Sequence, residues 1–305
     1  MPSVRDLWRD AARELLVHGL FLMPEARRVQ LDRRLRGREE ARKLLAADAA
    51  ILSYGKSGRT WLRVMLSRLC QQAFGLPEGQ MLEFDNLHRL DARAPKLLFS
   101  HGNYIRDHAD EWGTRRHLWA RPTVLLVRDP RDVAVSQYYQ WRHRMRRWKK
   151  IINRYPRGAA DLPLVDFVLD PEVGLPAIVA WLRVFEQELD RFTSIELVRY
   201  EDLRQDTSGE LRRILAFLGL PTDPALVADA VDYARLDNMR QLETTGGLKF
   251  AGIRGRPGDE RNPASFKTRK GKVGGWRDEL ALDEQARVRV ALEPLAPLPF
   301  GYALD

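Results

Sequence analysis

The sequence predicts an α/β fold in which a central parallel sheet is flanked by helices. Short apolar runs without alternation recur along the chain, and amphipathic helical patterns follow three of them. Uninterrupted apolar runs are typical of strands buried on both faces, and such strands alternate with helices in parallel sheets. The composition, 44% apolar and 30% charged residues in a chain of 305, is that of an ordinary globular protein.

The predicted elements follow one another as strand and helix. The predicted strands are Ala49–Tyr54, Lys96–Ser100, Thr123–Val127 and Ile195–Arg199. The predicted helices are Thr60–Gln72, Asp132–Trp148 and Gly209–Leu218. In such sheets, ligands bind at the carboxyl ends of the strands.

Residues 1–47 are predicted to form an N-terminal helical arm before a domain that spans residues 48–305. The apolar stretch Leu15–Met23 is too short to cross a bilayer, which takes about 20 residues. The Arg-dense pattern Arg27–Lys43 fits either a helix packed on the domain or an interfacial helix that makes peripheral contact with anionic lipid.

Charge and cysteine content restrict the partners and the compartment. Lys and Arg number 51 against 42 Asp and Glu, a net charge of +9 that attracts anions without selecting among them. The single cysteine, Cys70, forms no intrachain disulfide, which predicts a reducing compartment and a cytoplasmic location. The sequence contains no cluster of metal ligands, so no metal is expected.

The segment from Tyr54 to Trp61 has the composition of an anion-binding loop. It joins a buried strand to a helix and contains two glycines, a lysine and two hydroxyl residues. Glycines allow a close backbone approach, and a helix N-terminus attracts anions. The P-loop pattern of nucleoside triphosphatases fails here because Ala50 stands where its first glycine would be.

Five motifs, in order, resemble those of the sulfotransferases that use 3′-phosphoadenosine 5′-phosphosulfate (PAPS). They are Lys56–Trp61, Leu98–His101, Leu126–Ser136, Tyr200–Leu203 and Arg269–Trp276. The resemblance covers about residues 48 to 280 and implies a P-loop-like nucleotide-binding sulfotransferase fold with PAPS as donor and no metal.

The resemblance assigns donor-binding roles to particular residues. The 5′-phosphosulfate would be held by the first loop: Lys56, Ser57, Gly58, Arg59, Thr60 and Trp61. The 3′-phosphate would be held by Arg128, Ser136, Arg269, Lys270 and Gly271. Trp61 and Tyr200 would lie beside the adenine.

The strand end at Arg128 can also be interpreted from the residues themselves. Asp129 and Pro130 are expected to turn the chain, and Asp132 to cap the following helix. An arginine binds phosphate through two parallel hydrogen bonds, whereas a salt bridge from Arg128 to a neighbouring aspartate is the plainer alternative. Arg131 is interpreted as a structural ion pair.

The resemblance also implies the catalytic residues. His101 follows an apolar strand and would take the proton of a hydroxyl or amine acceptor, because an unperturbed imidazole titrates near neutral pH. Lys56 would stabilise charge on the leaving phosphate. The site motifs depart from the family pattern at Gly55, which replaces proline, at Arg59, which replaces a small residue, and at Phe99, which replaces a lysine. Arg235-Leu236 also replaces Ser-Phe, and Ala281 and Ala286 stand where the dimer motif has Thr and Glu.

The acceptor and two alternative functions stay open at this point. Residues 244–269 are predicted to form a lid loop, and eight of the sixteen residues from Arg142 to Arg157 are Lys or Arg. This basic segment fits either a solvated face or a docking strip for an acidic acceptor such as a glycan, a lipid or a charged small molecule. A P-loop-type small-molecule kinase is the alternative enzyme, and a nucleic-acid binder is disfavoured because no known motif is present.

Overall fold

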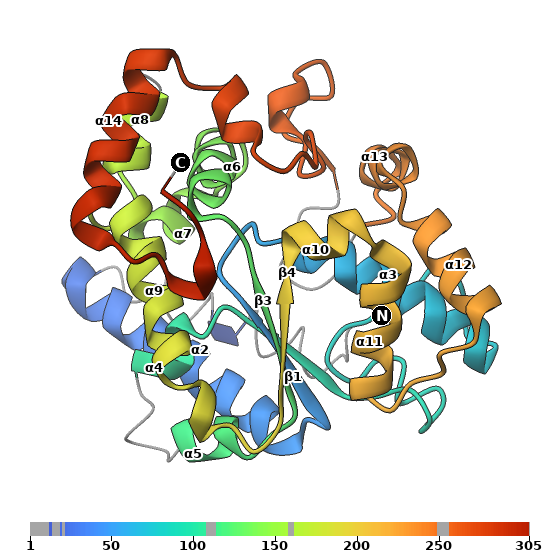
Figure 1. The fold of residues 1–305 in the computed structure, drawn as a ribbon. Coiled ribbons are helices and arrows are strands. Elements are labelled where there is room, and N and C mark those ends of the chain that lie inside the picture. The colour runs from blue at the N-terminus through green and yellow to red at the C-terminus, as the bar shows by residue number, and fades with distance from the viewer. Residues whose placement is uncertain are drawn as a thin grey trace.

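A four-stranded parallel sheet forms the centre of the computed structural model, which describes residues 12, 13, 19, 22–107, 114–157, 162–248 and 256–304 (Figure 1). The strand order is β2-β1-β3-β4. The strands are β1 (Ala49–Ser53), β2 (Leu97–Ser100), β3 (Thr123–Val127) and β4 (Ile195–Arg199). This arrangement confirms the predicted α/β fold with a central parallel sheet.

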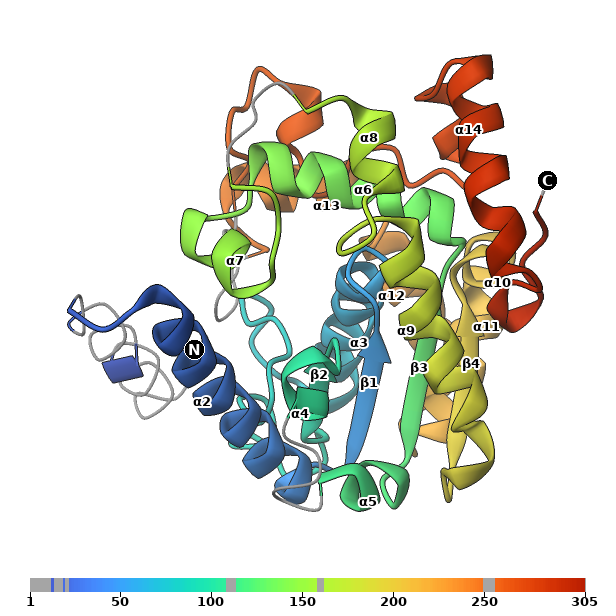
Figure 2. The ribbon, with the colours of Figure 1, turned by 90° about the vertical axis from the view of Figure 1, so that its left-hand side faces the viewer.

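Helices cover both faces of this sheet (Figures 1 and 2). The helices up to β4 are α2 (Glu25–Ala46), α3 (Arg59–Phe74), α4 (Asn103–Asp107), α5 (Thr114–Trp119), α6 (Pro130–His143), α7 (Arg147–Ile152), α8 (Leu164–Leu169) and α9 (Leu175–Gln187). After β4 come α10 (Tyr200–Gln205), α11 (Thr207–Phe217), α12 (Pro224–Tyr233), α13 (Leu236–Thr245) and α14 (Leu282–Leu292). Short 3-10 turns lie at Leu189–Arg191, Pro263–Ser265, Gly275–Asp278, Glu293–Leu295 and Pro299–Gly301.

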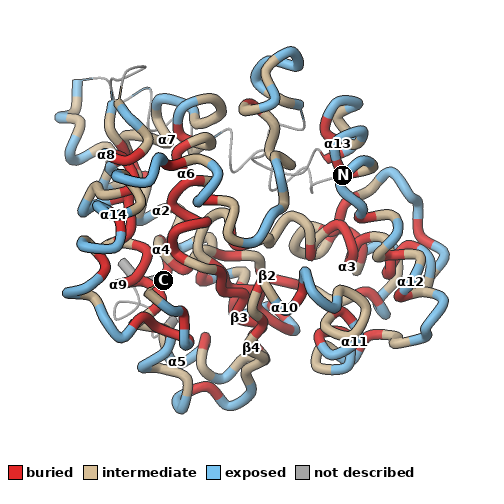
Figure 3. Tube along the Cα trace, turned by 45° about the horizontal axis from the view of Figure 1, so that its top comes forward, coloured by how far each residue is buried: buried red, intermediate tan, exposed pale blue. Residues whose placement is uncertain are grey.

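The two faces of the sheet explain why the strand sequences are apolar throughout. Ile51 of β1 packs into a core with α3, α11 and α12, whereas its neighbour Leu52 packs into the opposite core with α6 and α9. All residues of β1 and β3 are buried, and Figure 3 shows the buried chain concentrated around the strands. A strand buried on both faces has no position for a polar alternation.

The strand order creates a crevice at the carboxyl ends of β1 and β3. The chain passes from β1 to β2 on one side and then places β3 on the other side of β1. Loops that follow β1 and β3 therefore diverge, and such a point is where ligands bind in open α/β sheets. The loop that contains Lys56 follows β1, and Arg128 follows β3.

The structure corrects one predicted helix and bounds two predicted segments. The segment Asp132–Trp148, predicted as one helix, is divided between α6 and α7, with a break at residues 144–146. Helix α2 accounts for part of the predicted arm and packs against α4, α5 and α7. Helix α13 continues to Thr245, so the predicted lid begins after it; residues 249–255 of that segment lie outside the described residues.

Candidate active site

The loop between β1 and α3 has a backbone that side chains rarely tolerate. Lys56 has a φ of 73° and Gly58 a φ of 97°. A Cβ atom at Gly58 would lie 2.6 Å from the ring of Tyr200, so this position needs glycine for space as well as conformation. No side chain caps the N-terminus of α3. Backbone strain of this kind concentrates at functional sites.

The ammonium of Lys56 lies in a buried, strongly basic environment. Its Nζ donates to Oε1 of Gln140 at 3.3 Å. Burial lowers the pKa of Lys56 to about 7, and the positive charge of Arg144 is the next contribution. Such an ammonium is poorly solvated and lies near other cations, so an anion that binds beside it favours its charged form.

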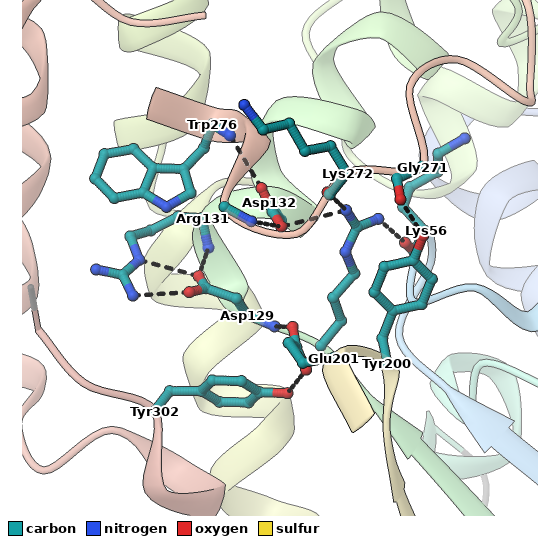
Figure 4. Close-up of polar contacts among 12 residues, drawn as sticks. Lys56, Asp129, Arg131, Asp132, Tyr200, Glu201, Gly271, Lys272, Trp276 and Tyr302 are labelled. Atoms are coloured by element: carbon teal, nitrogen blue, oxygen red, sulfur yellow. Dashed lines mark hydrogen bonds and ion pairs between the residues drawn. The ribbon is translucent and has the colours of Figure 1, made fainter. Parts of the chain in front are cut away.

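Arg128 lies against the same loop and binds it directly. Its Nη1 donates to the carbonyl oxygen of Lys56 at 3.2 Å, and its Nη2 donates to the carbonyl oxygen of Lys272 at 3.0 Å. Figure 4 labels Lys56 and Lys272, whose carbonyl oxygens accept these two hydrogen bonds. The side chain also makes an ion pair with Asp132 at 3.3 Å, the plainer alternative of the sequence, but it is buried rather than on the surface.

The turn after Arg128 differs from its predicted capping pattern. Asp129, and not Asp132, caps α6 by accepting from the amide of Arg131 at 2.8 Å. Asp132 instead accepts from the amides of Gly274 and Trp276 at 2.9 and 3.0 Å, which ties α6 to the C-terminal segment (Figure 4). The predicted structural ion pair of Arg131 is confirmed, with Asp129 at 2.7 Å.

Tyr200 and Trp61 form an aromatic corner beside the loop. Their ring centroids are 6.0 Å apart in an edge-on arrangement. The guanidinium of Arg128 lies 4.1 Å from the centroid of the Tyr200 ring, and the Tyr200 hydroxyl donates to the carbonyl oxygen of Gly271 at 3.2 Å. The corner therefore joins four of the five motifs.

The predicted pair Arg269 and Lys270 is held by a carboxylate that sequence reasoning missed. Glu279 makes an ion pair with Arg269 and another with Lys270 at 2.8 Å. Burial alone would raise the pKa of Glu279, but hydrogen bonds from Lys270, Tyr139 and Arg269 lower it to about 2. No local pattern in the sequence marks this glutamate, because its contacts arise only from the fold.

A second missed carboxylate, Glu243 of α13, anchors the segment that precedes Arg269. It is buried, pairs with Arg144, and accepts from the amides of Lys267 and Thr268 at 2.6 and 3.0 Å. Desolvation, and next the charge of Lys56, lowers the pKa of Lys267 well below its ordinary value. The described part of the predicted lid is thus attached to the basic site by Glu243.

His101 directly follows β2 and meets the first loop. Its Nδ1 lies 2.8 Å from the carbonyl oxygen of Ser53, and its Nε2 lies 2.8 Å from Nη2 of Arg59. A carbonyl oxygen only accepts and a guanidinium only donates, so Nδ1 carries the proton and Nε2 presents a lone pair. Burial, and next the charge of Arg59, lowers the pKa of His101 well below its ordinary value.

One cavity of about 1740 Å³ joins these groups. The predicted site residues that line it are Lys56, Gly58, Arg59, Thr60, Trp61, His101, Arg128, Ser136, Tyr200, Arg269, Lys270 and Gly271. Ser57 is not part of the lining and lies buried within the loop. The structure therefore brings together eleven of the twelve predicted donor-binding residues and the predicted base.

Three buried polar atoms of the predicted donor-binding residues make no hydrogen bond in the described part of the chain. They are Oγ of Ser57, Nη1 of Arg59 and Nε of Arg128. Buried donors without partners are rare in proteins and mark places where a ligand or water completes the network. Together with the cations around them, these atoms fit the phosphate and phosphosulfate groups of an anionic nucleotide.

Two further searches concern metals and membranes. Within the described ranges, no group of three or more His, Cys, Asp or Glu side chains is placed to hold a metal ion. None of the helices described has both the length and the apolar character needed to span a bilayer.

Comparisons with known proteins give a consistent result. Residues 46–295 match the sulfotransferase domain family. Rat sulfotransferase 2A1 is 26% identical over 286 residues, which cover 83% of this chain and 86% of the relative. The WSCD family member CG9164 of Drosophila melanogaster is 26% identical over 201 residues, which cover 61% of this chain and 55% of that protein. The chain thus spans about half the length of the WSCD relatives it matches.

Solved structures share the fold at low sequence identity. Mouse sulfotransferase SULT7A1 complexed with PAP superposes with a TM-score of 0.55 at 18% identity, and the match covers 87% of this chain and 92% of that one. Retinol dehydratase in complex with androsterone and inactive cofactor PAP gives a TM-score of 0.54 at 16% identity, with 84% and 83% covered.

Proposed function

The chain belongs to the sulfotransferase domain family, and from this premise we propose that it transfers the sulfuryl group of PAPS to a hydroxyl or amine acceptor with His101 as general base. The family match over residues 46–295 confirms the resemblance stated from the five motifs. The observation that carries the proposal is the lone pair of His101 Nε2, which lies beside the loop of Lys56 in the same cavity.

The donor-binding residues are proposed from the cations and hydroxyl groups of the motifs that line the cavity or lie in its first loop. Lys56, Ser57, Gly58, Arg59 and Thr60 would hold the 5′-phosphosulfate, and Arg128, Ser136 and the segment Arg269–Gly271 would hold the 3′-phosphate. The unpartnered atoms of Ser57, Arg59 and Arg128 support this assignment, because each could donate a hydrogen bond to an anionic oxygen.

The proposed reaction is an in-line displacement. PAPS supplies an activated sulfuryl group, whose bond to the phosphate oxygen breaks as the acceptor oxygen bonds to sulfur. His101 Nε2 receives the proton of the acceptor, and Lys56 stabilises the charge that develops on the leaving phosphate. Because Arg59 donates to Nε2, its guanidinium must leave that nitrogen before an acceptor reaches it.

The acceptor, peripheral membrane contact and the cellular location are also part of this proposal. Solved relatives contain small molecules, androsterone in one complex of retinol dehydratase and retinol in another. A glycan, a lipid or a small molecule stays the predicted acceptor range here. Membrane contact through residues 1–47 and a cytoplasmic location also stay predictions.

Substitution of His101 by alanine tests the base. We expect His101→Ala to lose roughly 10²–10⁴-fold in transfer of radiolabelled sulfate from PAPS to acceptors in a cell extract. Binding of 3′,5′-bisphosphoadenosine (PAP), the nucleotide that remains after PAPS has lost its sulfuryl group, should be retained, because the nucleotide is held by other residues. His117→Ala, at an exposed position of α5, is the matched control and should keep full transfer. Near-normal transfer by His101→Ala would refute the assignment of the base.

A further inference from the structure

The basic segment 142–157 turns toward the cavity rather than only toward solvent. Arg146, Lys149, Arg154 and Arg157 of this segment line the same cavity as His101. Helix α2 packs against α7 (Figure 2), and Arg33 of α2 donates to the carbonyl oxygen of Ile152 at 2.5 Å. The two helices together form one wall of the cavity, the α2–α7 wall.

A buried tyrosine of α4 lies among cations of α2 and α7. Tyr104 is 7% exposed, and its ring has three cations near its face: Arg33 at 5.3 Å, Arg36 at 5.6 Å and Lys149 at 5.7 Å. Tyr104 follows His101 by three residues, and its hydroxyl donates to Oδ1 of Asn153 at 3.2 Å. The cationic cluster is thus attached to the segment that carries the proposed base.

Two carboxylates lie near this cluster, and one of them, Asp32, pairs with a cation of the cluster itself. Asp32 is 1% exposed, pairs with Arg36 at 3.0 Å and accepts from Nε1 of Trp148 at 2.7 Å. Glu40 accepts from the hydroxyl of Ser100 at 2.8 Å, and burial raises its pKa. In the portion of the chain that is described, no carboxylate lies within ion-pair distance of the Lys149 ammonium.

Lys149 is therefore a poorly solvated cation that makes no ion pair with the described residues. Burial lowers its pKa to about 8, and the charge of Arg36 acts in the same direction. Removing a cation from water is costly unless an anion pairs with it. An anion brought by a ligand would supply that missing partner.

We propose that the acceptor is a hydroxyl compound that carries its own negative charge, a carboxylate or phosphate, and that Lys149 and its neighbours on the α2–α7 wall recognise this charge. The inference rests on the proposed function, because it identifies the acceptor side of the cavity by the position of His101. The phosphates of the donor are proposed to bind other cations, Lys56 and Arg128.

Binding of matched small probes to the PAP complex tests the proposal without a known acceptor. Para-nitrophenyl β-glucuronide is compared with para-nitrophenyl β-glucoside, and para-hydroxybenzoate with para-hydroxybenzamide, by isothermal titration calorimetry. Each pair differs chiefly by the presence of a carboxylate. We expect the anionic member to bind about tenfold more tightly, the scale of one charge-assisted hydrogen bond.

Two neighbouring lysines supply the variant and its control. Lys149→Met keeps the length of the side chain without its charge and should abolish the preference for the anionic probes, with PAP affinity unchanged. Lys150→Met is the control, because Lys150 lies over the Trp141 ring at 4.8 Å and does not line the cavity. It should keep the preference.

The contradicting results are also defined. Equal binding within each pair, absence of binding by the anionic probes, or a preference that survives Lys149→Met would overturn the inference. Failure of PAP to bind would instead count against the proposed function, and the same probes would then be compared on the protein without nucleotide.

Discussion

At His101, two hydrogen bonds decide which nitrogen can act as a base. The Ser53 carbonyl fixes the proton on Nδ1, and Arg59 donates to Nε2, so the imidazole is neutral with its lone pair directed at the loop. Arg59 stands where the family usually has a small residue. This one departure therefore places a cation on the atom that is proposed to receive the proton.

Removal of the Arg59 charge should raise the pKa of His101. The charge is the second largest cause of the lowered pKa, after burial, because a nearby cation disfavours a second positive charge. In Arg59→Thr the acid limb of the pH–rate profile should move to higher pH, since His101 is inactive once protonated. The ring resonances of His101 in an NMR titration, assigned with His101→Gln, measure the pKa directly.

Arg59→Lys is the matched control for this titration. Lysine keeps a positive charge near the imidazole, so the pKa of His101 should stay low. An unchanged pKa in Arg59→Thr would show that Arg59 does not tune the base.

Residues that directly follow strands could be located from the sequence, and residues with distant partners could not. Lys56, His101 and Arg128 each follow an apolar run, and parallel strands bring their carboxyl ends to one edge. The predicted capping role of Asp132 is wrong, because it binds amides of Gly274 and Trp276 more than a hundred residues away. No local pattern reveals such a contact.

Among the elements, the loop between β1 and α3 depends on contact with Tyr200 at the start of α10. Gly58 leaves room for that ring, and the ring in turn lies on the guanidinium of Arg128. The contacts among this loop, the end of β3 and α10 therefore depend on the absence of a side chain at Gly58.

Gly58→Ala should disrupt both the loop and nucleotide binding. The positive φ alone costs about 1–3 kcal/mol for a residue with a side chain, and the Cβ would also displace Tyr200. We expect a lower free energy of unfolding in urea and a large loss of PAP affinity by calorimetry.

Gly75→Ala is the control that separates backbone strain from the loss of space for the Tyr200 ring. Gly75 ends α3 with a φ of 63°, and a Cβ atom added there would meet no neighbouring atom within 4 Å. The variant should lose stability but keep PAP affinity. Equal PAP affinity in Gly58→Ala and Gly75→Ala would contradict the fitted corner.

The four strands and helices α3 and α11 could be predicted from apolar periodicity, but the break between α6 and α7 could not. Arg144 at the break pairs with Glu243 and donates to the carbonyl oxygen of Ser265 at 2.9 Å. Both partners are distant in sequence, whereas the helical pattern of the segment is local. The turn of the basic segment toward the cavity follows from this break, so the sequence alone leaves its direction open.

Over the whole molecule, much of the excess positive charge is directed toward one cavity. The chain carries a net charge of +9, and the cavity lining includes cations from the first loop, α7 and the segment near Arg269. Mutual repulsion and burial oppose this arrangement until an anion binds. The low pKa of Lys56 reflects both costs, first burial and then the positive charge of Arg144.

Nucleotide binding should therefore take up a proton. The pKa of Lys56 is about 7 without ligand, and a bound phosphate raises it by favouring the charged form. Above pH 7 binding requires protonation of Lys56, so PAP affinity should fall by up to about tenfold per pH unit. Calorimetry in buffers of different ionisation enthalpy measures the proton count between pH 7 and 9.

Lys56→Met is the control for this proton. The variant should bind PAP more weakly, and the proton uptake in this pH range should disappear. PAP binding by the unmodified protein with neither pH dependence nor proton uptake would contradict the assignment of Lys56 to the donor.

The central proposal is that the loops after β1 and β3 bind the two phosphate groups of one adenine nucleotide. Titration with PAP tests it most directly. Calorimetry should show PAP binding that Arg128→Ala weakens by at least about tenfold, because a phosphate loses its guanidinium partner. ATP with Mg²⁺ should bind far more weakly. Equal affinity for ATP–Mg²⁺ and PAP, or PAP binding unaffected by Arg128→Ala, would contradict the account.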